Sequence, residues 1–127
     1  MSTFLTPDQI LEIHRGVIRR TGGHASLRDY VLLESAALAP QEARFGELIN
    51  KTIRAQAATY WLSVALNRPF LEQNELTGLA VCETFLQMNG YQLDMTAEQI
   101  SEVLKRLGMK GFMTKDKLLQ SLRVRPT

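Results

Sequence analysis

Residues 67–90, NRPFLEQNELTGLAVCETFLQMNG, decide the fold that we expect for this chain. The segment begins as a short polar loop and is then apolar on nearly every face from Glu75 until Asn89 and Gly90. A helix that is apolar all round is normally buried, and an Asn-Gly pair tolerates the left-handed backbone that ends many helices. We therefore predict that this segment forms the buried central helix of a small domain.

The loop in front of this helix is a candidate ligand site. The first backbone N–H groups of a helix have no acceptor within it, and the helix dipole favours negative charge there. Six polar side chains lie around this position: Asn67, Arg68, Glu72, Gln73, Asn74 and Glu75. None is a histidine, the usual general base near neutral pH, and arginine does not deprotonate. Glu72 is a candidate ligand for a divalent ion, although Glu72 and Glu75 together disfavour phosphate.

The segments before the central helix carry helix signals of their own. Residues 6–9, TPDQ, form a capping box that opens a first helix, and Gly22 and Gly23 end it. Asp29 is a cap for a short second helix over about residues 29–39, which must stop before Pro40.

A third helix is predicted over about residues 47–66. We expect Tyr60 and Trp61 to pack against the central helix rather than stack on a base or a cofactor. Phe45, in the preceding loop, is expected to point inward. Three polar side chains of this helix are expected to point mostly outward: Lys51, Arg54 and Gln56.

The chain after the central helix predicts two further helices, capped by Thr96 and Thr114. Residues 91–94 are expected to be a connector, and the tail 124–127 is expected to be frayed. No segment shows the period-two alternation of a strand. The expected fold is therefore all-α, with about six helices around a buried central helix in a single domain, residues 1–127.

Composition sets the broad class of protein. An apolar share of 45% and a charged share of 22% are ordinary for a folded chain of 127 residues. The net charge of +2, from 15 basic and 13 acidic residues, gives no reason to expect a nucleic-acid partner. No apolar run is long enough to span a membrane and the N-terminus does not resemble a signal peptide, so we expect a cytoplasmic protein.

The cysteine and the two histidines are interpreted as structural. Cys82 is the only cysteine, so it cannot form an internal disulfide, and its apolar surroundings predict a buried thiol. His14 lies one step off the apolar stripe of the first helix and is expected to be a structural or solvent-edge residue, and His24 a surface residue. Because no second ligand stands at metal-binding spacing from either histidine, we expect no site based on histidine or cysteine.

Three segments, in order, resemble the Fic/Doc (Fido) family, and most closely its short Doc ("death on curing") branch. They are LTPDQILEIHRGVIRRTGG (residues 5–23), SLRDYVLLESAALAPQ (residues 26–41) and the stretch that begins at Asn67. In the last of these the branch reads roughly N-H-P-F-x-D-G-N-K-R-T-A-L and later F-L-x-x-N-G-Y. The matching residues are Asn67, Pro69, Phe70, Asn74, Thr77, Leu79, Phe85, Leu86, Asn89, Gly90 and Tyr91. The resemblance runs from Thr6 to about Leu122 and implies the family's helical fold.

The chemistry that the resemblance implies does not carry over residue by residue. Active members use a motif histidine as the general base for a target hydroxyl, and this chain has Arg68 there. The lysine and the phosphate-binding arginine of the motif are replaced by Glu75 and Leu76.

Two motif positions keep part of the family's character and one does not. Glu72 retains the acidic type that coordinates magnesium in the family, and Asn74 retains the motif asparagine. The small residue that lets the backbone approach phosphate is replaced by Gln73. Gln73 and Asn74 are the candidate nucleotide contacts, and Glu72 the candidate metal ligand.

These changes favour a degenerate, non-catalytic member that binds a protein partner, such as an antitoxin-like protein or a second copy of itself. We expect that partner to dock between the loop and residues 40–46, and we expect no cofactor. The alternative is a rewired transferase that moves a phosphoryl or nucleotidyl group from a nucleoside triphosphate, with Mg²⁺, to a protein hydroxyl. In that case Glu72 or Glu75 acts as base or metal ligand and Arg68 holds phosphate. A third class comprises unrelated binding to nucleic acid or small molecules.

Overall fold

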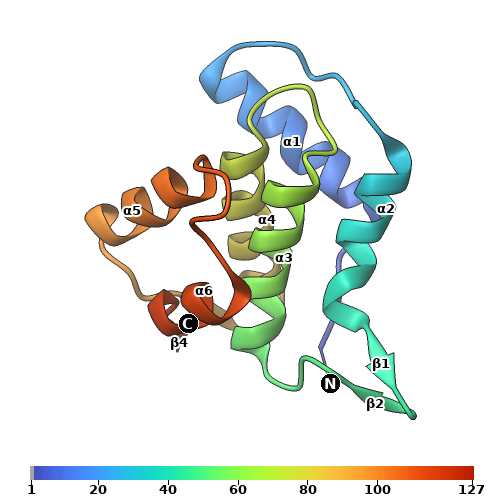
Figure 1. Ribbon diagram of the computed structural model, residues 1–127, viewed down its shortest axis with the longest axis vertical. Coiled ribbons are helices and arrows are strands. Elements are labelled where there is room, and N and C mark those ends of the chain that lie inside the picture. Colours follow the sequence, from blue (N-terminus) through green and yellow to red (C-terminus); the bar gives the residue numbers. More distant parts are fainter. Residues whose placement is uncertain (1) are drawn as a thin grey trace.

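The computed structural model describes residues 2–127 and confirms the all-α fold class. Six α-helices make up most of this part of the chain (Figure 1). They are α1 (Pro7–Thr21), α2 (Tyr30–Leu38), α3 (Ile53–Asn67), α4 (Asn74–Met88), α5 (Ala97–Leu107) and α6 (Lys115–Ser121).

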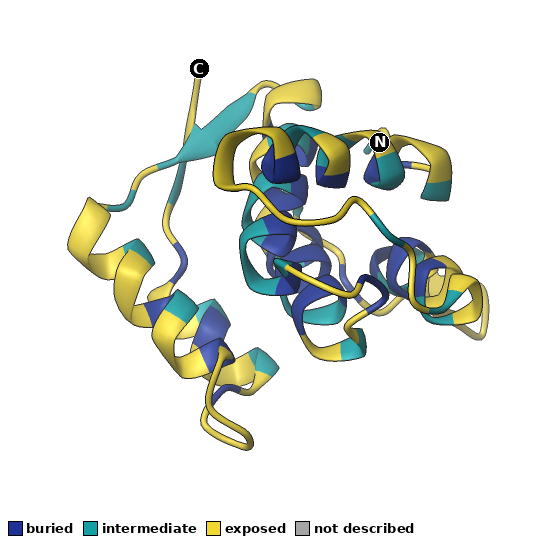
Figure 2. Cartoon of the chain, turned by 90° about the horizontal axis from the view of Figure 1, so that it is seen from above, coloured by how far each residue is buried: buried dark blue, intermediate teal, exposed yellow. Residues whose placement is uncertain are grey.

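The antiparallel pair α3 and α4 forms the centre of the molecule, and buried residues concentrate on it (Figure 2). Trp61 and Tyr60 of α3 are fully buried, and the Tyr60 ring lies 5.0 Å from that of Phe85 on α4. The hydroxyl of Tyr60 accepts a hydrogen bond from the backbone N–H of Leu5, and burial raises the pKa of Tyr60 to about 12. Cys82 of α4 is also fully buried, and burial raises the pKa of its thiol. The expected packing of both aromatic residues and the buried cysteine are confirmed.

The predicted helix caps are confirmed at four positions. Thr6, Asp29, Thr96 and Thr114 each accept a hydrogen bond from the backbone N–H three residues later. Gly22, with φ of 87°, ends α1 as expected.

The start of α3 differs from the expectation because residues 43–48 form a small hairpin. Thr52 caps α3, and β1 (Ala43–Arg44) pairs with β2 (Glu47–Leu48) in antiparallel register. Phe45 occupies the tip of this hairpin in a left-handed conformation and is fully exposed, so its expected inward orientation was wrong. The tip projects away from the core (Figure 1), which leaves the ring no apolar surface to cover.

Gln56 was expected outside and is instead 2% exposed. Its amide nitrogen donates to the carbonyl of Asn50, and its amide oxygen accepts from the hydroxyl of Ser2. A buried amide is tolerated in a core when both of its ends are hydrogen-bonded. Gln56 can therefore be buried because Asn50 and Ser2 supply those hydrogen bonds.

The tail is ordered rather than frayed. Strand β4 (Val124–Pro126) pairs antiparallel with β3 (Tyr91–Leu93), the segment expected to be a connector. Three-residue strands are too short to show alternation, so the sequence pattern could not reveal them.

The hairpin and the α3–α4 loop (residues 68–73) lie at opposite ends of α3 (Figure 1). A helix of 15 residues is about 22 Å long. The expected docking groove between the loop and residues 40–46 therefore does not form. Within residues 2–127, no helix is both long enough and apolar enough to cross a membrane.

α4 packs closely against α3 at Gly78, where a larger residue would not fit. A Cβ added at Gly78 would lie 2.6 Å from the carbonyl oxygen of Trp61, so Gly78→Ala must push the central helices apart. We expect a loss of about 1–3 kcal/mol in the free energy of unfolding, and a fall of several degrees in Tm.

Gly16→Ala in α1 is the matched control, because its added Cβ would meet only arginine side-chain ends at 3.7 and 3.8 Å. Alanine in that helix interior should stabilise by about 0.5–1 kcal/mol. Equal Tm values for the two variants would contradict the close approach.

Candidate active site and its scaffold

The α3–α4 loop is bounded by two residues in the left-handed conformation. Arg68, with φ of 50°, ends α3, and its backbone N–H donates to the carbonyl of Val64. Gln73, with φ of 64°, precedes α4 and provides no side-chain cap. Non-glycine residues pay roughly 1–2 kcal/mol for this conformation, so surrounding contacts must impose it.

Asn74 imposes the turn from the start of α4. Its Oδ1 accepts from the backbone N–H of Phe70 at 3.0 Å, and its Nδ2 donates to the carbonyl of Phe70 at 2.9 Å. Both residues are fully buried. The amide of Asn74 is therefore used to fix the shape of the loop.

His14 of α1 supports the same turn from the other side. Its ring stacks on that of Phe70, with centroids 3.7 Å apart and planes 4° from parallel. Its Nε2 lies 3.0 Å from the carbonyl oxygen of Glu72 and donates to it in the neutral Nε2–H form. Burial lowers the pKa of His14, with Arg15 adding to the effect, while the hydrogen bond to Glu72 opposes it. The structural assignment of His14 is confirmed; its position one step off the apolar stripe was the only sequence signal.

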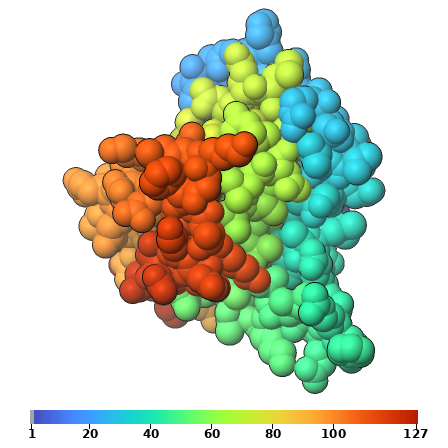
Figure 3. Space-filling model, in the orientation of Figure 1, coloured from blue at the N-terminus to red at the C-terminus, as the bar shows by residue number. Residues whose placement is uncertain are grey.

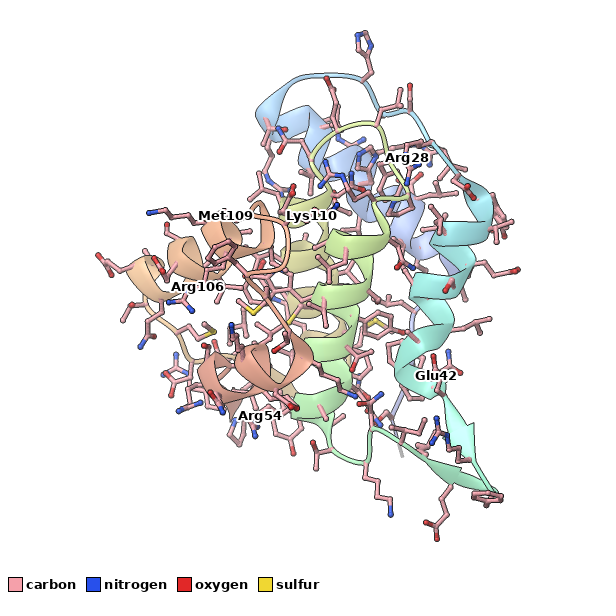
Figure 4. All side chains as sticks on the ribbon, in the orientation of Figure 1. Arg28, Glu42, Arg54, Arg106, Met109 and Lys110 are labelled. Atoms are coloured by element: carbon pink, nitrogen blue, oxygen red, sulfur yellow. The ribbon has the colours of Figure 1, made fainter. Side chains whose placement is uncertain are left out.

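The link between α1 and α2 runs antiparallel to the loop. Leu27 forms an isolated bridge with Phe70, and the backbone N–H of Leu71 donates to the carbonyl of Ser26 at 3.1 Å. Arg28, labelled beside the loop in Figure 4, donates through Nε to the carbonyl of Arg68 at 2.7 Å and through Nη2 to that of Asn67 at 3.0 Å. Sequence reasoning missed Arg28, although it lies in the family-like segment SLRDYVLLESAALAPQ quoted above.

Glu72 is held by this link. One carboxylate oxygen accepts from the backbone N–H of His24 at 2.7 Å, and His24 itself is exposed, as expected. A Cβ at Gly23 would lie 2.1 Å from that oxygen, so the carboxylate lies directly against the glycine backbone. Within residues 2–127 no three His, Cys, Asp or Glu side chains are grouped as metal ligands.

An ion pair crosses the N-terminus of α4. Nη1 of Arg68 lies 2.8 Å from Oε1 of Glu75, whose side chain is 24% exposed in the first turn of the helix. Negative charge is favourable at this position because of the unpaired N–H groups and the helix dipole. Gln73 and Leu76, the two neighbouring candidates, are only partly exposed.

The match to known proteins decides the family. The model of the Fic/DOC family matches residues 4–86, which include α1 to α3, the loop and most of α4. The chain belongs to the Fic/Doc family. It is also 30% identical over 91 residues to "Toxin Doc" of Mycolicibacterium smegmatis (strain ATCC 700084 / mc(2)155), an alignment that covers 70% of each chain.

The Fic/Doc scaffold thus brings the sequence-predicted residues together around one turn. Arg68, Glu72, Gln73, Asn74, Glu75 and Leu76 all lie within the loop or the first turn of α4. The geometry gives four of them internal partners, since Asn74 binds Phe70, Glu72 binds His24, and Glu75 and Arg68 pair with each other.

The buried His14 predicts a pH dependence. Because its pKa is lowered in the fold, the unfolded chain takes up a proton near pH 6.5 that the folded chain does not. The free energy of unfolding should therefore decrease as pH falls below 6.5, by at most about 1.4 kcal/mol per unit. Urea unfolding between pH 7.5 and pH 5.5, about two units, measures this slope.

The matched variant is His14→Gln, which removes the titrating group and should flatten the slope. The difference between the two proteins is needed because burial raises the pKa of Glu83, against the opposing effect of Arg20. The contribution of Glu83 to the free energy of unfolding is lost as pH rises through its folded pKa, so its pH dependence is opposite in sign to that of His14. Identical slopes for the two proteins would show that His14 does not titrate as described.

Proposed function

We propose that this chain is a Doc-like, toxin-related protein that is not catalytic and acts by binding a protein partner. The observation that carries the proposal is the Arg68–Glu75 ion pair across the N-terminus of α4. A carboxylate already lies where the resemblance would have a nucleotide phosphate bind. A phosphate would have to displace Glu75 or bind beside its negative charge.

The loop also lacks the histidine that would be the usual general base near neutral pH. Arg68 stands at the position of the family's motif histidine, and losing a general base removes roughly 10²–10⁴-fold in rate. Replacing preorganised cations with Glu75 and Leu76 removes a further electrostatic contribution.

The donor set does not fit a magnesium–phosphate group. Glu72 is the one carboxylate in the position that the resemblance assigns to the metal, and one of its oxygens is already hydrogen-bonded to His24. Mg²⁺ bound through a single carboxylate relies on substrate phosphates for its remaining ligands, which the charge of Glu75 disfavours. We therefore propose no resident cofactor.

A shallow groove between α1 and α4 is suited to the partner. The groove has a volume of ≈ 400 Å³, is lined mainly by apolar atoms from Leu5, Ile13 and Met88, and has Asp8 and Glu12 at its edge. An amphipathic helix with an apolar face and a basic residue toward Asp8 would complement both its shape and its charge. The name of the relative, Toxin Doc, supports a toxin-related role. We propose that the occupant is an antitoxin-like protein and that the complex forms in the cytoplasm.

One observation favours the alternative, a rewired transferase. A hollow of ≈ 390 Å³ lies beside Arg68, between the end of α3 and the loop after α5, and Lys110 also lines it. Two cations and the apolar Leu66 and Leu107 suit an organic anion such as a nucleotide. Glu72 or Glu75 would then have to act as the base.

Thermal unfolding with millimolar Mg²⁺ and ATP, GTP, CTP or UTP tests the absence of nucleotide binding. A ligand at about 100 times its Kd stabilises by about 2.7 kcal/mol, which shifts Tm by several degrees or more in a domain of this size. We expect no shift. A magnesium-dependent shift for one nucleotide, lost in Arg68→Ala, would overturn the proposal and favour the transferase.

The restored variant Arg68→His/Gln73→Gly/Glu75→Lys/Leu76→Arg is the positive control. It removes the ion pair and supplies the family's motif residues, so it should gain the nucleotide-dependent shift that the natural chain lacks. If neither the natural chain nor the restored variant shows a nucleotide-dependent shift in Tm, the loss of binding has a cause outside these four positions.

Substitution in the α1–α4 groove tests the partner site. The product of the gene adjacent to that of this chain, coexpressed with it, is the probe. We expect a stoichiometric complex that Met88→Glu weakens at least tenfold, because a charged side chain then replaces part of the apolar wall against which the apolar face of the partner packs. Val31→Glu, which alters an exposed apolar residue of α2, is the matched control and should bind normally. Equal binding by both variants, or self-association in place of a complex, would contradict this site.

A further inference from the structure

The near-neutral charge of the whole chain conceals a strong asymmetry along it. Residues 101–127 contain seven basic residues and two acidic residues, a net charge of +5. The preceding 100 residues contain the other eight basic and eleven acidic residues, a net charge of −3. The basic segment comprises the end of α5, α6 and β4, which form one face of the molecule (Figure 3).

Arginines from α3, from α5 and from the segment after α6 line a groove on this face. Two adjoining hollows of ≈ 330 and ≈ 550 Å³ share Gln120 and Arg123 in their walls. Arg106 of α5 lines the first hollow and Arg54 of α3 lines the second. Figure 4 shows Arg106 and Arg54 on this side of the molecule, near α5 and α6 respectively. Glu102 is the one acidic residue of the walls, and it is paired with Arg106 at the exposed surface.

Two of the arginines are held in place by the C-terminal end of α6. Arg123 donates through Nη1 to the carbonyls of Gln120 at 2.7 Å and Leu122 at 3.0 Å. Arg54 donates through Nη1 to the carbonyls of Leu119 and Leu122. Within residues 2–127, the Nε and Nη2 groups of both arginines donate no hydrogen bond to the protein. A guanidinium that is already ordered loses less side-chain freedom when an anion binds to its remaining donors.

We propose that this groove, which we call the α5–α6 groove, binds the phosphate backbone of single-stranded nucleic acid. Arg106 lies in the first hollow, Arg123 lies in both, and Arg54 lies in the second. This order along the groove suits contacts to successive phosphates. The groove is concave, whereas recognition of a duplex usually places a protruding helix or ribbon into the duplex groove. No aromatic ring lines the two hollows, so the binding is to the backbone and independent of sequence.

Fluorescence anisotropy with labelled oligothymidylate and oligouridylate of about 15 nucleotides tests this proposal. Three phosphate contacts predict that log K falls with log salt with a slope of about −2, since each contact to a single strand contributes about −0.7. The two probes separate DNA from RNA as the source of the phosphates. No binding to either probe at about 50 mM salt would overturn the proposal.

Arg106→Gln is the primary variant because Arg106 does not cap α6. It should weaken binding several-fold and reduce the slope by about 0.7. Arg44→Gln in the β1–β2 hairpin removes the same charge from an exposed site outside the groove, and should leave binding and slope unchanged. Both variants should keep the Tm of the natural chain. Equal losses of affinity in the two variants would show that binding depends on the overall charge of the protein and not on the groove, and would overturn the proposal.

Competition against the labelled oligonucleotide distinguishes a nucleic acid from an acidic protein, and a single strand from a duplex. Polyglutamate at equal charge should not displace the oligonucleotide, and a duplex of the same length should bind more weakly than the single strand. Displacement by polyglutamate would replace the proposal with an acidic protein partner. Tighter binding of the duplex would also overturn it.

Discussion

The turn at Phe70 is the interaction on which the rest of the site depends. Its backbone N–H and carbonyl are both bound by Asn74, and its ring stacks on His14. These contacts tie α1, the α3–α4 loop and α4 together at one buried point. A buried backbone that left its polar groups unpaired would lose roughly 1–3 kcal/mol for each. The loop therefore keeps its shape because Phe70 anchors it in the core.

Much of the fold could be predicted because local signals agree with the tertiary structure. Caps such as Thr6 and Thr96 act within one turn, and the apolar run around Cys82 can only be accommodated inside. The errors fall where a distant segment decides the outcome. Gln56 is buried because Asn50 and Ser2 pair with it, and the tail is ordered because Tyr91–Leu93 pairs with it.

The same division applies to the candidate site. The candidate positions, from Arg68 to Leu76, come from one contiguous stretch that resembles a family motif, and their chemical roles stay predictions. His14 and Arg28, which hold that stretch, come from elements remote in sequence, and their roles required the folded geometry. The pairing of Arg68 with Glu75 was likewise not predicted, because the positive φ of Arg68 sets the direction of its side chain.

Gln73 keeps a left-handed backbone without the glycine that would adopt it freely. The contour of the loop is thus set by the contacts of Phe70 with Asn74 and His14 rather than by a glycine at position 73. The shape of the backbone and the chemistry of the side chains are separate properties of such a loop. Exposed side chains of the loop can be exchanged while its backbone keeps the same conformation. A chain of this kind can lose one activity and still present a rigid, well-defined surface for another.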